Sequence, residues 1–406
     1  MSKTCTYYQP EYVSRFHCDG QKCSAKCCRN WQIFIDKKTY KKYSHIKPKS
    51  AANEITRFIT KRENLEEYMI KLDENFNCPF LTDDNWCSIQ RKHGEEFLSE
   101  ICRTYPRRIW DFKTFRERSL VLTCPIAAEL ILLSDESLKF EEVTDNYTIQ
   151  KLIPVNCSAE FIDQVLKIQR TATAILQDRN LTIDKRLMML GLYCDKLDEL
   201  FDNDRIDELE AVNLAYQSSK FLQEQSAQFS AVLKFDVHNY IKIVMELLNS
   251  LYGKDSGVLQ GQGERIILDA ITETLNLLSN ETEQFKISEV AKRYSELNFE
   301  REKFVSGVST ILENYLVNEF FMNLYPFRFE SNKAFNYGMF VATYKMLELV
   351  TFSMARANYS SNEDLISQII WYSANIDHNQ SYVNKISEYM KDKSDIVQIM
   401  QNMLQV

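Results

Sequence analysis

The chain has 406 residues, with 49 lysines and arginines against 57 aspartates and glutamates, so its formal charge is −8. This acidic balance argues against a nucleic-acid binder that relies on phosphate contacts. Hydrophobic residues make up 45% of the chain, enough for a buried core, and the length suggests about two or three domains. There are 9 glycines, and none of their spacings forms a dinucleotide or Walker loop. Residues 253–263 are predicted to be a plain loop.

No targeting or membrane-spanning segment is predicted. Residues 1–16 contain neither an apolar core nor a small-residue cleavage site, and no run of about 18 apolar residues occurs. We therefore expect a cytoplasmic protein that does not engage a membrane. Thiols stay reduced in that compartment, so clustered cysteines there bind metal more often than they form disulfides.

Cysteines and charge divide the chain into two parts. No cysteine follows Cys194, and residues 1–125 carry a net charge of +7 while the remainder carries −15. Such asymmetry often marks two surfaces with different partners. The expected fold class is mainly α, with a small cysteine-rich, metal-bound N-terminal region at 1–130 followed by a larger all-helical body at 131–406.

Short elements joined by loops are predicted in the N-terminal region. Residues 31–35 alternate between apolar and polar, as in a strand. Asp36 is placed to cap a helix that runs to Tyr43. Three further elements are predicted, namely a charged helix, a short helix and a second strand, at 54–70, 95–102 and 119–123.

The body is predicted to be helical almost throughout. No proline occurs in residues 155–325, so long helices can run through that stretch. Apolar residues recur at helical spacing in 161–176 and 266–278. Residues 304–324 and 334–357 are apolar nearly all round, as in buried helices.

Eight cysteines in the N-terminal region form two groups: Cys18, Cys23, Cys27 and Cys28, and then Cys78, Cys87, Cys102 and Cys124. Thiolates are soft ligands that select zinc, copper(I) or iron–sulfur clusters. The first group is wider than the paired spacing of a structural zinc site. The pattern favours an iron–sulfur cluster, and zinc or an unmetallated region remain alternatives.

The three remaining cysteines, and a further cysteine spacing known from other metal sites, give no evidence for a second site. The C-x3-C-x2-C spacing of radical-initiating clusters is broken, because its third cysteine falls on Asn30. Cys194 lies in a helical apolar pattern, which predicts a buried small hydrophobe. Cys157 is predicted to lie in a loop and Cys5 near a frayed terminus.

Several segments resemble bacterial flagellin lysine-N-methylases. In the N-terminal region these are residues 14–43, 77–107 and 118–125. The shorter pattern that begins at Cys78 is also similar to a broader group of small proteins that chelate zinc or iron. Residues 313–327, ENYLVNEFFMNLYPF, resemble a segment in the C-terminal half of the methylases, and the chain length agrees with that family.

The resemblance implies methyl transfer from S-adenosylmethionine to the ε-amine of surface lysines of flagellin, which would be the protein partner. It also implies a [4Fe–4S] cluster held by the eight cysteines, enough for one cluster with four spare thiols or for two clusters. Because no glycine-rich nucleotide loop is present, S-adenosylmethionine would need a pocket of another kind, such as one between helices. The alternative is a non-enzymatic iron- or zinc-chelating interaction protein.

Polar residues in an apolar segment supply the predicted site of the body. Methylation needs the neutral lysine amine, whose ordinary pKa is about 10.4, so a group must accept or relay the proton. We assign Glu313 and Tyr315 to catalysis. Asn314 and Asn318, which face the same way on a helix, are assigned to cofactor binding. Satisfied polar contacts in a core are the alternative.

Two arginines complete the predicted cofactor site. Arg103 and Arg107 flank Pro106 and follow Cys102 closely in sequence. A guanidinium there could bind the carboxylate of the cofactor or reduce the charge cost of a thiolate cluster. A solvated basic surface is the alternative.

Overall fold

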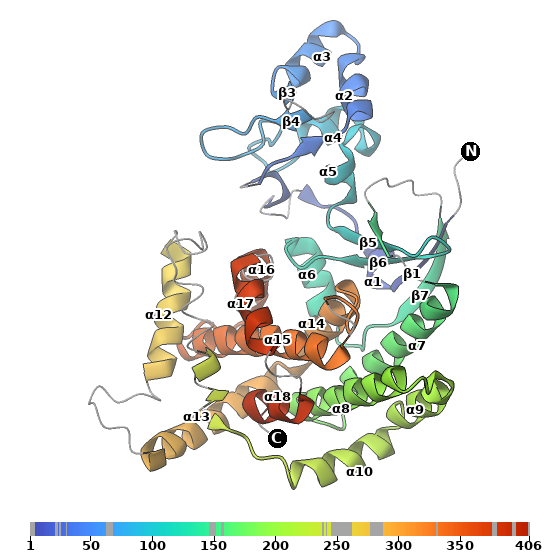
Figure 1. Cartoon of the computed structure of the whole chain (residues 1–406). Helices are drawn as coiled ribbons and strands as arrows, with labels where there is room; N and C mark the ends of the chain where they lie inside the picture. The colour runs from blue at the N-terminus through green and yellow to red at the C-terminus, as the bar shows by residue number, and fades with distance from the viewer. Residues whose placement is uncertain are drawn as a thin grey trace. The chain divides into compact units, whose positions relative to one another are not determined.

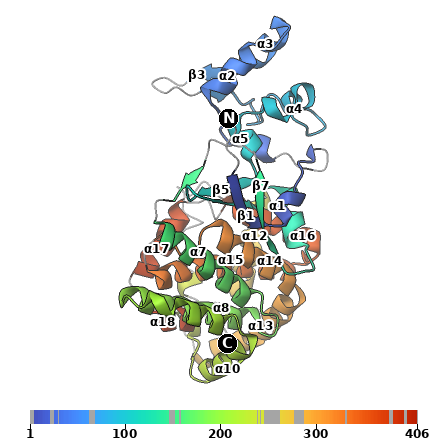
Figure 2. The same cartoon turned by 90° about the vertical axis from the view of Figure 1, so that its right-hand side faces the viewer.

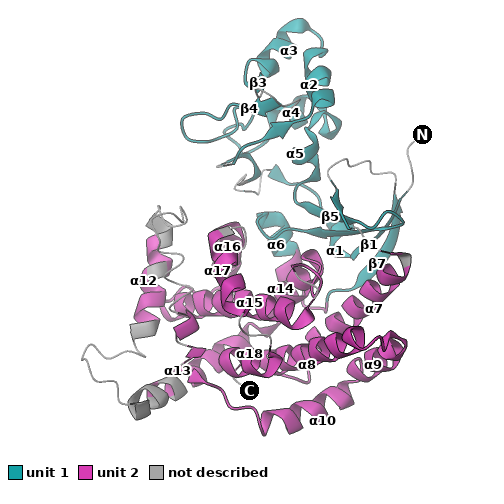
Figure 3. Ribbon diagram, viewed as in Figure 1, with its two compact units in different colours: residues 1–130, 138–157 teal, residues 131–137, 158–406 magenta. Residues whose placement is uncertain are grey.

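The computed structural model describes residues 5–20, 23, 26–29, 31–61, 68–145, 152–155, 158–237, 239–240, 242–244, 262–276, 287–329, 332–375, 380–391 and 395–404. The chain forms two compact units, coloured separately in Figure 3. Unit 1 comprises residues 1–130 and 138–157, and unit 2 comprises 131–137 and 158–406. The first unit therefore takes up a segment that follows the expected boundary at residue 130.

A five-stranded sheet forms part of unit 1. Its strands, in spatial order, are β7 (Phe140–Asp145), β1 (Cys5–Pro10), β6 (Arg116–Leu120), β5 (Arg107–Asp111) and β8 (Ile153–Pro154). β1 runs parallel to β6 and antiparallel to β7, with Tyr7 opposite both Arg116 and Val143. The expectation of an all-helical chain from residue 131 was wrong for β7 and β8. Both segments are the edge strands of a sheet whose inner strands come from earlier in the chain.

A smaller antiparallel sheet and several short helices complete unit 1. The sheet has the order β2 (Phe34–Ile35), β4 (Tyr68–Ile70) and β3 (Ile59–Lys61). The helical elements are α1 (Tyr12–Arg15), η2 (Lys26–Cys28), α2 (Lys37–Ser44), α3 (Lys49–Thr56), α4 (Ser88–His93), η3 (Glu95–Phe97), α5 (Glu100–Thr104) and α6 (Pro125–Leu132), the last of which ends in unit 2.

The local predictions for unit 1 met mixed outcomes. The cap is confirmed, because the Asp36 carboxylate accepts a hydrogen bond from the Thr39 amide at 2.8 Å. The predicted helix at 54–70 was wrong. Helix α3 ends at Thr56, and β3 pairs with β4 so that Ile59 lies opposite Ile70. Pairing between strands outweighs the helical propensity of this charged segment.

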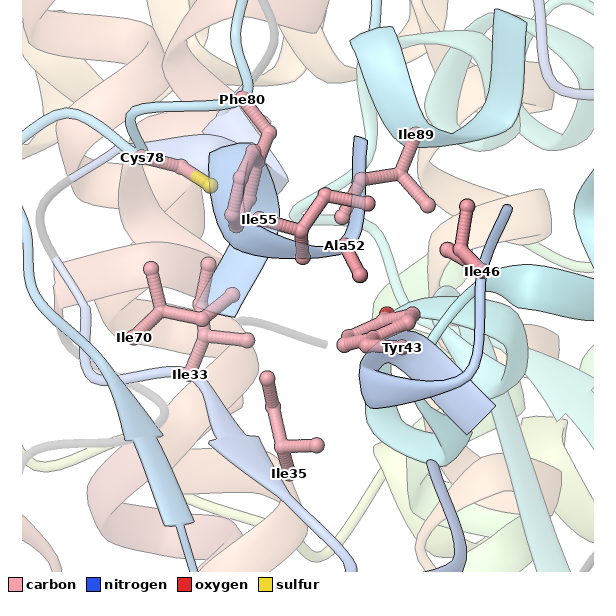
Figure 4. Packing of buried hydrophobic residues seen from close by; sticks show 10 residues of the cluster. All are labelled: Ile33, Ile35, Tyr43, Ile46, Ala52, Ile55, Ile70, Cys78, Phe80 and Ile89. Atoms are coloured by element: carbon pink, nitrogen blue, oxygen red, sulfur yellow. The ribbon is translucent and has the colours of Figure 1, made fainter. Parts of the chain in front are cut away.

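A cluster of buried side chains joins the smaller sheet to its helices (Figure 4). Ile33 and Ile35 from the β2 segment, Tyr43 from α2 and Ile55 from α3 point into it, together with Phe80. Partly buried cysteines pack against the same cluster. The apolar core of this part of unit 1 therefore also supports the thiols.

Unit 2 is built from helices, which confirms a mainly α chain (Figure 1). They are α7 (Ala159–Leu176), α8 (Ile183–Asp202), η4 (Ile206–Glu208), α9 (Leu209–Tyr216), α10 (Ser219–Ser230), α12 (Gln262–Asn276), α13 (Ile287–Gly307), α14 (Ser309–Met322), α15 (Lys333–Arg356), α16 (Asn362–Asn375), α17 (Gln380–Lys391) and α18 (Ile396–Met403). None of the described helices combines the length and the apolar character that a membrane crossing requires.

Helix α15 lies at the centre of unit 2. It packs against α8, α12, α13, α16, α17 and α18 and is buried along nearly its whole length. Helices α7 and α8 lie side by side in both views (Figure 1 and Figure 2). The predicted helix at 334–357 is confirmed, whereas the one at 304–324 is divided at Val308 between α13 and α14. A helix that is apolar all round is the one that others surround.

The remaining cysteine and loop predictions can be placed briefly. Cys194 is 1% exposed on α8, as expected of a small core residue. Cys5 begins β1 and so belongs to the large sheet. Cys157 and most of the predicted loop at 253–263 lie outside the described residues.

Candidate functional site

Unit 1 contains a cavity of about 250 Å³ that all eight predicted metal-binding cysteines line. We call it the thiol cavity. Its cysteines are Cys18, Cys23, Cys27, Cys28, Cys78, Cys87, Cys102 and Cys124. They come from segments up to about a hundred residues apart, so the fold brings both sequence groups to one place.

Backbone pairing fixes the loops that carry the central thiols. The amide of Cys78 donates to the carbonyl of Cys28 at 2.8 Å. Cys87 stands at the N-terminus of α4 and forms an isolated bridge with Leu81. Cys102 lies on α5, where the Ser99 hydroxyl accepts a hydrogen bond from its amide at 3.4 Å. These hydrogen bonds fix the backbone that carries the thiols, and they require no bound metal.

Arg29 ties the two cysteine groups together. Its Nη1 donates to Oδ1 of Asn77 at 3.0 Å, and its Nη2 donates to Oδ1 of Asn85 at 2.9 Å. Nearby, Nε1 of Trp31 donates to the carbonyl of Cys27 at 2.6 Å. One planar guanidinium therefore spans the loop after Cys28 and the turn that precedes Cys87. The sequence offered only its position beside an adjacent cysteine pair as a signal, and Arg29 was not predicted as a site residue.

Burial favours the protonated form of several of these thiols when nothing binds them. It raises the pKa of Cys18 to about 11 and the pKa values of Cys102 and Cys124 to about 12. The pKa of Cys27 is raised first by its contact with Cys28, whose Sγ lies 3.9 Å away, and then by burial. Thiolates are stabilised by a bound cation, so this chemistry suits a soft metal centre.

The side chains do not stand in a finished ligand arrangement. Among the described residues, no three His, Cys, Asp or Glu side chains converge with the geometry of a metal site. The donor set itself fits a thiolate-bound metal, because eight soft ligands line one cavity. Which of them ligate stays a prediction.

Arg103 and Arg107, the predicted cofactor arginines, also line the thiol cavity. The Arg107 guanidinium lies 5.2 Å from the ring centre of Phe16. His17, Tyr43 and Tyr105 add aromatic groups to the wall. A cationic wall beside soft ligands could hold the carboxylate of a small molecule next to a metal centre.

The predicted residues of the body lie on α14 in unit 2. Glu313 is 1% exposed, and its Oε2 accepts from Nη1 of Arg186 at 2.8 Å, while its Oε1 accepts from Nη2 of Arg179 at 3.0 Å. The Ser137 hydroxyl donates to the same carboxylate at 3.3 Å. These contacts satisfy the buried charge and favour a structural role. The catalytic role assigned to Glu313 stays a prediction.

Tyr315 and the two asparagines are buried as well, each at most 1% exposed. The side-chain amide of Asn314 donates to the carbonyl of Ser134 at 2.8 Å, whereas its Oδ1 has no partner among the described residues. An unpaired buried acceptor is costly unless something donates to it. Oδ1 of Asn314 could therefore accept from the ammonium group of a bound cofactor.

A second buried set of charges in unit 2 was not predicted. Arg301 lies against both Asp184 and Glu348, and Nζ of Lys345 lies 2.8 Å from Asp184 Oδ1 and 3.1 Å from Glu348 Oε1. We call these four residues the charge quartet. It joins α8, α13 and α15. Lys345 and Asp184 are 161 positions apart, so no local pattern could reveal the pairing.

Comparison with known families identifies the body. Residues 169–405 match the family model described as the FliB lysine N-methylase C-terminal domain, which covers more than half of the chain. The chain belongs to this family. The match includes Glu313, its two arginines and the charge quartet, whereas the thiol cavity precedes it.

Curated relatives are similar to this chain over part of its length. The Lysine-N-methylase of Salmonella typhimurium is 34% identical over 147 residues, which is 35% of this chain and 36% of the relative. The Lysine-N-methylase of Salmonella choleraesuis is 34% identical over 146 residues, with the same shares. The aligned part thus spans about a third of those relatives.

A shorter relative is matched more completely. The flagellar biosynthetic protein FliU of Salmonella muenchen is 34% identical over 145 residues, which is 34% of this chain and 85% of the relative. No solved structure matches the chain.

Proposed function

We propose that this protein is a lysine N-methyltransferase that transfers methyl groups from S-adenosylmethionine to surface lysines of flagellin. The observation that carries the proposal is the family match over residues 169–405. Relatives named Lysine-N-methylase, and one named as a flagellar biosynthetic protein, support the reaction and the flagellar substrate. A cytoplasmic location agrees with a chain whose clustered cysteines must stay reduced.

We further propose that the thiol cavity holds an iron–sulfur cluster of the [4Fe–4S] type. Support comes from the gathering of eight thiols around one cavity, where burial raises the pKa values of several of them. Such a cluster would supply a redox-active, Lewis-acidic centre. Arg29 would keep the loops of the two cysteine groups in register around it.

The acceptor lysine must lose its proton before it can be methylated. Its amine is protonated at neutral pH, because the ordinary pKa is about 10.4. The acidic charge of the body attracts a lysine-bearing surface. Tyr315, which is buried on α14 two positions after Glu313, is the group proposed to relay the proton. Asn314, Asn318, Arg103 and Arg107 are proposed to orient S-adenosylmethionine.

Intact-mass measurement of flagellin tests the activity directly. Flagellin expressed with this protein should gain mass in steps of about 14 Da for each methyl group, at lysines that peptide mapping identifies. Flagellin expressed with a Cys27→Ser/Cys28→Ser variant serves as the control. Unchanged flagellin mass together with tight retention of iron or zinc would instead support a non-enzymatic chelator, which the thiol cavity would also suit.

A further inference from the structure

Helix α2 carries a strongly basic surface. We define the lysine face as the exposed side chains of Lys38, Lys41, Lys42, Lys47 and Lys49. Residues 36–61 contain eight lysines and arginines against two carboxylates. Both carboxylates are already engaged, since Asp36 caps α2 and Glu54 lies 3.4 Å from Nζ of Lys92. The positive potential of the lysine face is therefore largely uncompensated from within the segment.

The side chains of the lysine face have few local partners. No ion pair involves Lys38, Lys41, Lys47 or Lys49 in the part of the chain that the structure describes. Lys42 instead donates to the carbonyl of Glu96 and lies 4.2 Å from the ring centre of Phe97. This contact fixes the end of α2 but adds no negative charge.

The opposite face of α2 reaches the thiol cavity. Tyr43 is 1% exposed, points into the core cluster that contains Cys78 (Figure 4), and lines the cavity wall. Burial raises its pKa, and the neighbouring Cys102 and Cys87 raise it further. A partner on the lysine face would thus be separated from the thiols by the thickness of one helix, about 10 Å.

The sign of the charge selects the class of partner. A surface that presents lysines for methylation would be repelled by the lysine face, because like charges across an interface cost free energy. A long polyanionic nucleic acid would extend beyond this small patch and meet the remainder of the chain, which carries a net charge of −15. A compact acidic protein need contact only the N-terminal region, whose residues 1–125 carry a net charge of +7.

We propose that the lysine face docks an acidic one-electron carrier protein, which reduces the iron–sulfur cluster in the thiol cavity. The inference rests on the proposed function, because it requires that cluster. The carrier loses one electron and the cluster gains it, passing from [4Fe–4S]2+ to [4Fe–4S]1+. No covalent bond forms or breaks, and no proton is transferred in this step.

Stopped-flow reduction of the purified, cluster-containing protein tests the docking. The probe is reduced flavodoxin, an acidic flavoprotein, and the variant is Lys38→Glu/Lys41→Glu/Lys49→Glu. A matched control, Lys234→Glu/Lys303→Glu/Lys391→Glu, changes the net charge equally at exposed lysines of unit 2. The second-order rate constant should fall at least about 10-fold in the first variant at low salt, and its dependence on salt should flatten. The control should react like the unaltered protein.

Dithionite, a small reductant that needs no docking surface, separates the possible failures. It should reduce the cluster equally fast in all three proteins. Equal flavodoxin rates in the lysine variant and the unaltered protein would overturn the docking proposal while leaving the cluster in place. A purified protein that contains no iron and shows no visible cluster absorption has no such cluster, and then the cluster proposal and the docking proposal both fall. A change in sedimentation confined to the lysine variant would show that the face binds a second copy instead.

Discussion

Arg186 and Glu313 form a buried ion pair across 127 positions of sequence, with Nη1 of the arginine 2.8 Å from Oε2 of the glutamate. Their side chains are 5% and 1% exposed. The pair joins α8 to α14, and Arg186 also donates to the carbonyls of Leu176 and Leu181. The glutamate that stands out in an apolar sequence is thus paired with a charge from another helix.

Removing Arg186 should destabilise unit 2 severely. In Arg186→Met the Glu313 carboxylate keeps only the half-exposed Arg179 as a charged partner. Breaking a buried pair costs about 3–5 kcal/mol of unfolding free energy, because one charge remains buried. Arg179→Met is the matched control and should cost about 1 kcal/mol or less, because its side chain is 43% exposed. Urea unfolding measures both, and equal small losses would contradict a structural role for the pair.

The charge quartet should make stability depend on acid pH. Burial alone would raise the pKa of Glu348, but Arg301 and Lys345 outweigh it and lower the pKa from 4.5 to about 2. The stabilisation from this ionised carboxylate is therefore complete above about pH 4.5 and is lost as the pH falls through about 2. We expect Glu348→Gln to be less stable than the unaltered protein at neutral pH, with a difference that narrows below pH 4.5. The exposed Glu388→Gln is the control for urea unfolding across this range.

Arg29 should hold the metal indirectly. Arg29→Met removes the bonds to Asn77 and Asn85 without touching a thiol. Loss of a supporting contact around a metal site typically lowers metal affinity by about 10–100-fold. Competition with a chelator measures the effect, and Lys71→Met, an exposed residue of the same unit, is the control. Unaltered metal retention by Arg29→Met would show that the two loops keep their register without it.

Cys27 and Cys28 should be required for bound metal. Cys27→Ser or Cys28→Ser should lose iron and much of the folded protein, since metal-bound thiolates contribute folding free energy. Cys194→Ala should keep its iron, because Cys194 is buried on α8 in the other unit. Elemental analysis and visible absorption give the result. Full iron content in both serine variants would remove this adjacent pair from the ligand set.

Asn314 and Asn318 should matter more for methylation than for folding. If they orient the cofactor, Asn314→Ala and Asn318→Ala should lower flagellin methylation by about 10²-fold. If they are core contacts, the main effect is a loss of about 1–3 kcal/mol of stability. Thermal melting and methylation of the same samples separate these outcomes. Normal methylation by stably folded variants would move the cofactor site away from α14.

Interactions between residues close in sequence allowed part of this structure to be predicted. The Asp36 cap, the helix at 333–356 and the burial of Cys194 each depend on neighbours within a few turns. The spacing of eight cysteines likewise pointed to one thiol-rich region. These features need no knowledge of distant segments, because capping and hydrophobic periodicity act locally.

Tertiary structure alone decided the long-range pairings. Residues 140–145 became an edge strand because β1 offered a free side for pairing, and the predicted helix at 54–70 gave way to strand pairing. The partner of Glu313 and the charge quartet depend on helices that meet only after folding. A buried charge is tolerated only beside its counterion. The residues around Glu313 or Lys345 in the sequence do not indicate which distant residue supplies that counterion.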